Sequence, residues 1–136
     1  MRRAYLDANV IVRLVTNDPT DMADAAARVF EQVDEGRLEL VLDGVVLAET
    51  VWVLSSFYGF SAQDIAPALA TLLAGDGIVS EEKTELMQAL ALYDEKGIDF
   101  VDALVAVRML KHGIREVYSF DKHFDRLQSI TRIEPH

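Results

Sequence analysis

The chain has 136 residues, enough for one compact domain that buries a hydrophobic core without disulfide bonds or a structural metal. Hydrophobic residues make up 51% and charged residues 26%, the balance of a globular protein rather than a disordered one. The absence of cysteine excludes disulfides and thiolate metal sites, and the net charge of −10 is opposite to that of proteins that bind nucleic acid by broad phosphate contact.

The first part of the sequence predicts two strands and three helices. A short strand ends in Asp7, and residues 17–19 (Asn-Asp-Pro) break the chain, since a proline disfavours helix at the residue before it. Asp43 is expected to N-cap the third helix. The predicted segments are strand 3–7, helix 9–16, helix 21–34, strand 38–42 and a helix that extends to residue 56.

The rest of the sequence predicts three more helices and further short strands. Ser61 and Asp64 have the spacing of a capping box, Ser80 is expected to cap the next helix, and Asp99 to cap the one after it. The predicted segments are helix 61–73, strand 78–79, helix 81–95, helix 99–111, strand 116–119, a helical turn at 121–127 and strand 130–133.

The alternation of strands and helices predicts an α/β fold with a central, mainly parallel sheet flanked by helices. No linker or repeat divides the sequence, so residues 1–136 are expected to form a single domain. Residues 61–95 contain little strand between two helices and are expected to form a helical arm.

Four acidic residues stand out by their positions: Asp7, Glu49, Asp102 and Asp121. In a parallel sheet, the carboxyl ends of the strands and the starts of the following helices share one edge, so these side chains are expected to converge there. Clustered carboxylates repel one another and need a cation. Oxygen ligands without cysteine suit Mg²⁺ or Mn²⁺, which can activate water and stabilise a phosphodiester in reaction.

Taken singly, each acid also has a purely structural interpretation. Asp7 can end a strand, Glu49 can be one polar residue on an apolar helix, and Asp121 can cap a short helix. Asp99 can be the N-cap of a helix, and Asp102 can be a first-turn acid that interacts favourably with the helix dipole. The structural interpretation is preferred for Asp99, and a role in the acidic site is preferred for Asp102. Composition alone favours a solvated acidic surface over a metal site.

The sequence resembles a PIN domain, in particular the VapC type of toxin–antitoxin ribonuclease. The resemblance lies in four stretches that follow one another in the family's order along nearly the whole chain. Each stretch alone is weak evidence, and the four in order are strong evidence. They are residues 5–11 (YLDANVI), 47–50 (LAET), 99–106 (DFVDALVA) and 119–124 (SFDKHF).

The resemblance implies a three-layer PIN-like fold and RNA cleavage that depends on Mg²⁺, with Mn²⁺ able to substitute. It implies metal ligands and catalytic residues at Asp7, Glu49, Asp102 and Asp121, and a positioning role for Ser119. It also implies a cognate antitoxin, whose segment packs on the toxin, and a homodimer. Asn9 matches the polar residue that often follows the first acid, whereas Asp99 lies where the family is often not acidic. RNA would be held by local cations, for which the candidates are Arg13, Lys122 and His123.

Other functions fit the sequence less well. A phosphatase of the haloacid dehalogenase type needs a second aspartate where this chain has Asn9. A receiver-like signalling domain needs an acidic pair beside Asp7, and only Asp43 could be its phosphoacceptor. The remaining alternative is a catalytically inactive PIN-like binding module, although such a module would be expected to have lost at least one of the four acids.

Nothing in the sequence predicts export or membrane insertion. Arg2 and Arg3 look like the start of a signal peptide, but Asp7, Asn9 and Arg13 interrupt the apolar stretch that should follow. No run approaches the ~18 apolar residues of a membrane span. A cytoplasmic location without membrane contact is therefore expected.

Overall fold

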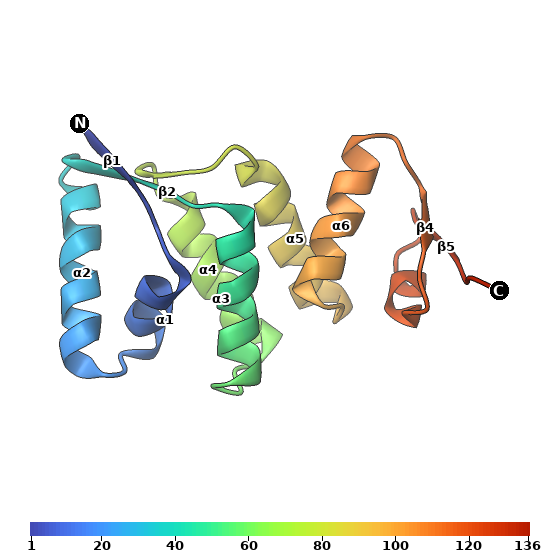
Figure 1. The fold of residues 1–136 in the computed structure, drawn as a ribbon, viewed down its shortest axis with the longest axis horizontal. Helices are drawn as coiled ribbons and strands as arrows, with labels where there is room; N and C mark the ends of the chain where they lie inside the picture. Colours follow the sequence, from blue (N-terminus) through green and yellow to red (C-terminus); the bar gives the residue numbers. More distant parts are fainter. The chain divides into compact units, whose positions relative to one another are not determined.

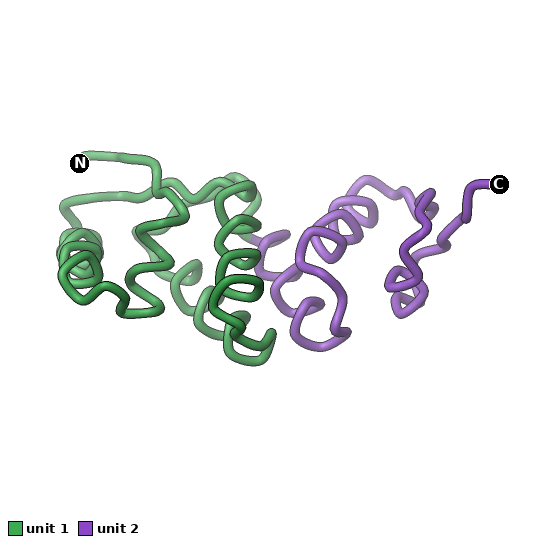
Figure 2. Tube along the Cα trace, turned by 60° about the horizontal axis from the view of Figure 1, so that its bottom comes forward, with its two compact units in different colours: residues 1–83 green, residues 84–136 purple.

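Helices and strands alternate along the chain, as the sequence predicts for an α/β protein (Figure 1). The structure, a computed structural model, describes residues 1–136. The chain forms two compact units, which we call unit 1 (residues 1–83) and unit 2 (residues 84–136) and describe in turn (Figure 2).

Unit 1 contains a three-stranded parallel sheet of β1 (Arg2–Tyr5), β2 (Leu38–Val41) and β3 (Ile78–Val79), in the order β1-β2-β3. Tyr5 is opposite Val41, and Val41 is opposite Val79. The carboxyl ends of the three strands are therefore level, and the segments that follow them leave from one edge of the sheet.

Three of the four helices of unit 1 begin where a local side chain accepts from a free backbone N–H group, whereas the helix that follows Pro19 begins without such a bond. Asp7 accepts from the N–H of Ala8, Asp43 from that of Val45, and Ser61 from that of Asp64, as the sequence predicts for the last two. The helices are α1 (Ala8–Thr16), α2 (Thr20–Asp34), α3 (Gly44–Ser56) and α4 (Ala62–Ala74).

The core of unit 1 lies between the sheet and the apolar faces of these helices. α1 packs against α2 and α3, α2 also against β2, and α4 against α3 and β3. Alternate residues of β2 are buried, as expected for a strand with one face on a core. The largest fully buried side chains of this unit are Ile11, Leu42, Leu47, Leu54, Ile65, Leu69 and Leu73.

Unit 2 contains two helices and a two-stranded parallel sheet. Tyr93 and Phe100 are buried in this unit and form an edge-on pair whose ring centroids lie 6.3 Å apart. β4 and β5 pair with Glu116 opposite Thr131. The elements are α5 (Lys83–Lys96), whose first residue belongs to unit 1, α6 (Phe100–Lys111), β4 (Glu116–Tyr118), the 3₁₀ helix η1 (Lys122–Arg126) and β5 (Thr131–Ile133).

Three details differ from the sequence-based expectation. Ser80 accepts from the N–H of Glu82, as a cap does, but α5 begins at Lys83 and not at residue 81. The two helices at 61–95 do not form a unit of their own. α4 belongs to unit 1, in which β3 pairs with β2, and α5 belongs to unit 2 except for its first residue, Lys83. Asp99 occupies the N-cap position of α6, but its side chain makes no capping hydrogen bond.

No helix has the length and apolar character needed to cross a bilayer.

Candidate active site

Two of the predicted site acids, Asp102 and Asp121, lie together in unit 2. Asp102 is in the first turn of α6, and Asp121 follows β4 and N-caps η1. His123, in η1, is the third member of this group: the ligand atoms of the three side chains all lie within 4.8 Å of one another. Two of the four acids, distant in sequence, therefore lie in one polar cluster.

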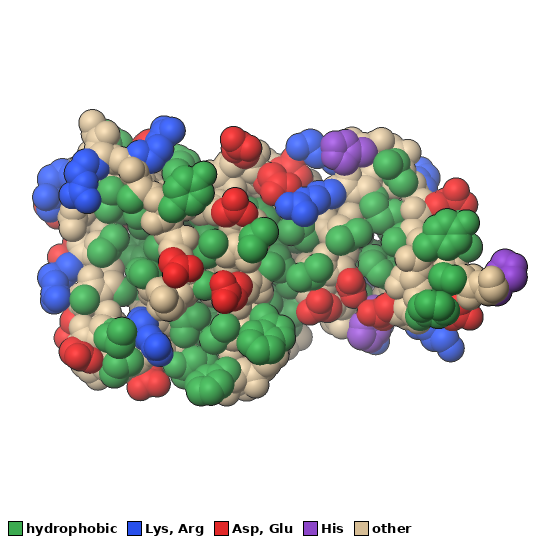
Figure 3. Space-filling view, viewed as in Figure 1, with side chains coloured by type: hydrophobic (Ala, Val, Ile, Leu, Met, Phe, Trp, Pro, Cys, Tyr) green, Lys and Arg blue, Asp and Glu red, His purple; other side chains and the backbone are tan.

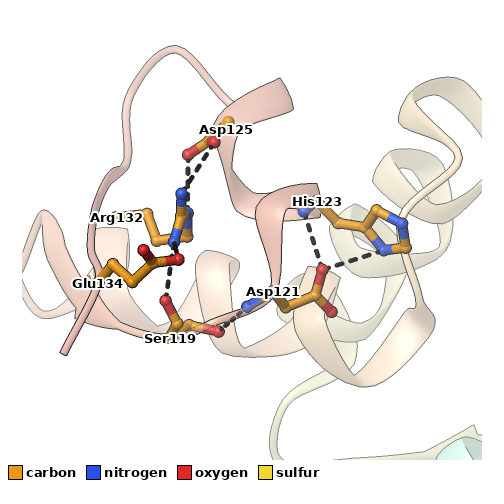
Figure 4. Close-up of polar contacts among 6 residues, drawn as sticks. All are labelled: Ser119, Asp121, His123, Asp125, Arg132 and Glu134. Carbon is orange, nitrogen blue, oxygen red and sulfur yellow. Dashed lines mark hydrogen bonds and ion pairs between the residues drawn. The ribbon is translucent and has the colours of Figure 1, made fainter. Parts of the chain in front are cut away.

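Local hydrogen bonds orient Asp121 (Figure 4). Its N–H donates to the hydroxyl of Ser119 at 2.9 Å, and its Oδ1 accepts from the N–H of His123 at 2.9 Å. The His123 Nδ1 lies 3.3 Å from the same oxygen. The serine predicted to have a positioning role thus contacts the main chain of Asp121, and His123 contacts its carboxylate.

The environment moves the pKa values of the two acids in opposite directions. Burial raises the pKa of Asp102 to about 6, aided by its hydrogen bond with Asp121 and by the negative charges of Asp121 and Asp99. The N–H of His123 lowers the pKa of Asp121, and the hydrogen bond with Asp102 lowers it further. At neutral pH both groups are ionised at close range, an arrangement that a cation stabilises.

The other two predicted acids lie in unit 1. Asp7 follows β1 and caps α1, with its Oδ1 2.8 Å from the N–H of Ala8. Glu49, on α3, lines a cavity of about 280 Å³ together with Asn9. Both carboxylates are exposed, and acidic side chains appear on the face of this unit over α1 and α3 (Figure 3). Their participation in one site with Asp102 and Asp121 stays a prediction.

Arg13, a candidate RNA contact, lines the same cavity but is already held by neighbours. Its Nη1 donates to the carbonyl of Asp18 at 3.2 Å and to the Tyr58 hydroxyl at 3.4 Å, and its buried Nε has no partner. This side chain therefore connects α1 to the α1–α2 turn and the end of α3. Of the other two candidates, His123 pairs with Asp121, and Lys122 is exposed.

The expectation that Asp99 caps α6 is wrong. Its exposed side chain makes no hydrogen bond to the helix, and its effect on this region is its charge, which raises the pKa of Asp102. The backbone at this residue, with φ −58° and ψ 145°, leads into the helix without the side-chain bond.

Two arginines that the sequence analysis did not single out make inward contacts in unit 2. Arg126 donates to the carbonyls of Lys96 and Gly97, and Arg132 contacts Ser119 and two carboxylates. These contacts connect segments that are not adjacent in sequence, so no residue spacing or hydrophobic periodicity predicts them.

The donor set of this cluster fits a hard divalent cation. The carboxylates of Asp102 and Asp121 supply the oxygen ligands that Mg²⁺ and Mn²⁺ prefer. The remaining positions around Mg²⁺ are commonly filled by water and by substrate phosphate, so two protein carboxylates on one side are sufficient for such an ion.

The chain is similar to known proteins over most of its length. The family model described as PIN domain matches residues 4–130. A curated protein named VapC ribonuclease, from Aquifex aeolicus (strain VF5), is 27% identical over 122 residues, which cover 90% of each chain. A solved structure, that of Mycobacterium tuberculosis VapC20, is titled a Sarcin-Ricin loop cleaving toxin; it has a TM-score of 0.43 and 24% identity, covering 97% of this chain and 99% of that one.

Proposed function

Because this chain belongs to the PIN domain family, we propose that it is a ribonuclease that hydrolyses RNA phosphodiester bonds at a divalent metal site. The observation that carries the proposal is the pairing of Asp102 with Asp121, in which burial and mutual repulsion raise the pKa of Asp102 to about 6. Perturbed carboxylates of this kind are typical of catalytic sites.

We assign the metal ligands to Asp7, Glu49, Asp102 and Asp121. The geometry of unit 2 supports Asp102 and Asp121, and the order of the four family motifs supports Asp7 and Glu49. The ion is Mg²⁺, with Mn²⁺ able to substitute. When bound, such an ion supplies a Lewis acid that neutralises phosphate charge and lowers the pKa of a water molecule.

The residues of the chain orient the carboxylates of this site and set its charge. Ser119 fixes the main chain of Asp121, so the Asp121 carboxylate points toward Asp102. In hydrolysis, water adds to the phosphorus, the bond from phosphorus to the leaving oxygen breaks, and that oxygen takes up a proton. His123 contacts Asp121 from the exposed side of the cluster, where an RNA phosphate would approach.

The likeness to VapC proteins also supports the biological setting. We propose that the chain is the toxin of a toxin–antitoxin pair, that a cognate antitoxin inhibits it, and that it acts in the cytoplasm as a homodimer. The family match runs through both compact units, from residue 4 to residue 130, and for this reason we propose that the whole chain works as a single nuclease domain.

The test is cleavage of a fluorescent single-stranded RNA by purified protein with EDTA, Mg²⁺ or Mn²⁺. We expect cleavage with either metal, none in EDTA, and none by Asp102→Asn. The matched control is Glu95→Gln, which neutralises an exposed acid elsewhere in unit 2. RNA binding without cleavage under all conditions would instead indicate an inactive PIN-like binding module.

A further inference from the structure

Arg126 connects the 3₁₀ helix that carries Asp121 to the end of α5. Its Nη1 donates to the carbonyl of Lys96 at 3.2 Å and to that of Gly97 at 2.8 Å. Such carbonyls at the end of a helix have no partner within the helix, and a cation there is favourable. The same segment leads directly into α6, so these bonds connect η1 to the backbone from which the helix of Asp102 starts.

Gly97 permits this close contact. Its φ of +64° is in the left-handed region that glycine adopts without strain, and a Cβ there would lie 3.2 Å from Nη1 of Arg126. The corner between α5 and α6 therefore has the conformation and the free space that the guanidinium needs.

Arg132, on β5, contacts the chain on both sides of Asp121 (Figure 4). Its Nη1 donates to the carbonyl of Ser119 at 3.0 Å, and its Nε and Nη2 donate to the two carboxylate oxygens of Asp125 at 3.1 and 3.3 Å. Nη1 also lies 3.3 Å from Glu134. The arginine side chain is only 12% exposed, and a two-pronged pair with a carboxylate has more geometric specificity than an ordinary surface ion pair.

The two arginines thus hold the segment of Asp121 at three points: at Ser119 before it, at Asp125 after it, and at the α5–α6 corner. The bonds in question go to main-chain carbonyls and to carboxylates outside the Asp102–Asp121 pair. We propose that Arg126 and Arg132 are positioning residues that fix Asp121 opposite Asp102 and thereby set the affinity of the site for its metal. This inference rests on the function proposed above.

The competing explanation is that these arginines bind RNA phosphate directly. The buried guanidinium of Arg132 argues against it for that residue. A substitution of Asp125 separates the two explanations for Arg132. If Arg132 binds RNA, loss of the Asp125 carboxylate frees the guanidinium for that contact. If Arg132 positions Asp121, the same loss releases one attachment of the Asp121 segment and weakens metal binding.

The experiment measures binding of Mn²⁺ alone to the full chain, without RNA, by electron paramagnetic resonance of the free ion. The variants are Arg126→Met, Arg132→Met, Arg132→Lys and Asp125→Asn, with Asp121→Asn as the reference for loss of a ligand. Arg115→Met is the matched control, since Arg115 is an exposed arginine of the same unit. Circular dichroism and thermal melting establish that each variant is folded.

We expect Arg126→Met and Arg132→Met to bind Mn²⁺ about tenfold more weakly, the usual effect of losing a group that orients a ligand. Asp125→Asn should weaken binding in the same direction, Arg132→Lys should recover part of the affinity, and Arg115→Met should bind as the unchanged protein does. If either methionine variant does not fold, Asp125→Asn and Arg132→Lys decide the question by the same measurement.

Unchanged Mn²⁺ affinity in the folded arginine variants overturns the positioning role, whether or not RNA binding weakens. That outcome leaves the proposed function standing as long as Asp121→Asn does lose affinity. If Asp121→Asn also binds Mn²⁺ as tightly as the unchanged protein, the metal site itself is wrong, and both proposals fail.

Discussion

Asp102, in the first turn of α6, faces Asp121 at the start of η1, with their ligand oxygens within 4.8 Å. The two carboxyl groups differ in surroundings: Asp102 is half-buried, whereas the carboxylate of Asp121 accepts the N–H of His123. Without a cation, Asp102 keeps its proton up to a pH of about 6, and above that pH the two carboxylates repel each other. A divalent ion can replace that proton, which gives the pair several measurable consequences.

Metal should stabilise the folded protein, and Asp102 should carry much of the effect. An ion that binds only the native state raises the free energy of unfolding by about 2.7 kcal/mol at one hundred times its Kd. After removal of bound metal with EDTA, we expect Mn²⁺ to raise the melting temperature of the unchanged protein and to raise that of Asp102→Asn by less than half as much. Equal shifts for the two proteins would remove Asp102 from the site.

The metal-free protein should lose stability as the pH rises from about 4 to about 6. The pKa of Asp102 is raised from 3.8 to about 6 in the folded state, so in this window the unfolded chain releases a proton that the folded chain retains. This loss of stability is absent at pH values below the pKa of Asp102 in the unfolded chain and complete at pH values above its pKa in the folded protein. Because other carboxylates contribute slopes of their own, the quantity to measure is the difference in stability between Asp102→Asn and the unchanged protein. In EDTA this difference should grow as the pH rises from about 4 to about 6, and a difference that is flat with pH would contradict the raised pKa.

Asp7 should serve two separable purposes, the cap of α1 and a charge of the metal site. Asparagine retains a side-chain oxygen that can accept from Ala8 but lacks the charge, whereas alanine lacks both. We expect Asp7→Asn to abolish RNA cleavage with little change in melting temperature, and Asp7→Ala to abolish it and also cost about 0.5–2 kcal/mol of stability. Full cleavage by Asp7→Asn at the same metal concentration would refute the role of Asp7 as a ligand.

Asp99 and Asp102 should differ sharply on substitution by alanine. Since the Asp99 side chain makes no capping bond, Asp99→Ala should change stability by no more than about 0.5 kcal/mol and leave cleavage largely intact. Asp102→Ala should abolish cleavage and weaken Mn²⁺ binding, and the metal-free protein should be as stable as before or more so, because one repelling charge is lost. An inactive but well-folded Asp99→Ala together with an active Asp102→Ala would reverse this assignment.

The sequence by itself determined the features that depend on near neighbours in the chain. The caps at Asp43, Ser61 and Asp121 are bonds to N–H groups two or three residues away, and the proline break and helix-ending glycines act just as locally. Alternating strand and helix patterns then predicted the parallel α/β class, and the order of four acidic motifs predicted the family. Each of these features leaves a short-range pattern in the sequence.

Only the tertiary structure decided which groups meet and how they are charged. The Arg126–Gly97 bond joins residues 29 apart in sequence, and the contacts of Arg132 with Ser119 and Asp125 depend on how β5 pairs with β4. The raised pKa of Asp102 and the free side chain of Asp99 likewise depend on burial and on the local path of the backbone. Desolvation and long-range hydrogen bonds are properties of the folded arrangement, whereas propensities and caps are properties of short segments. For this reason the proximity of Asp102 and Asp121 was predictable from the sequence, while their pKa values and the arginine contacts around them were not.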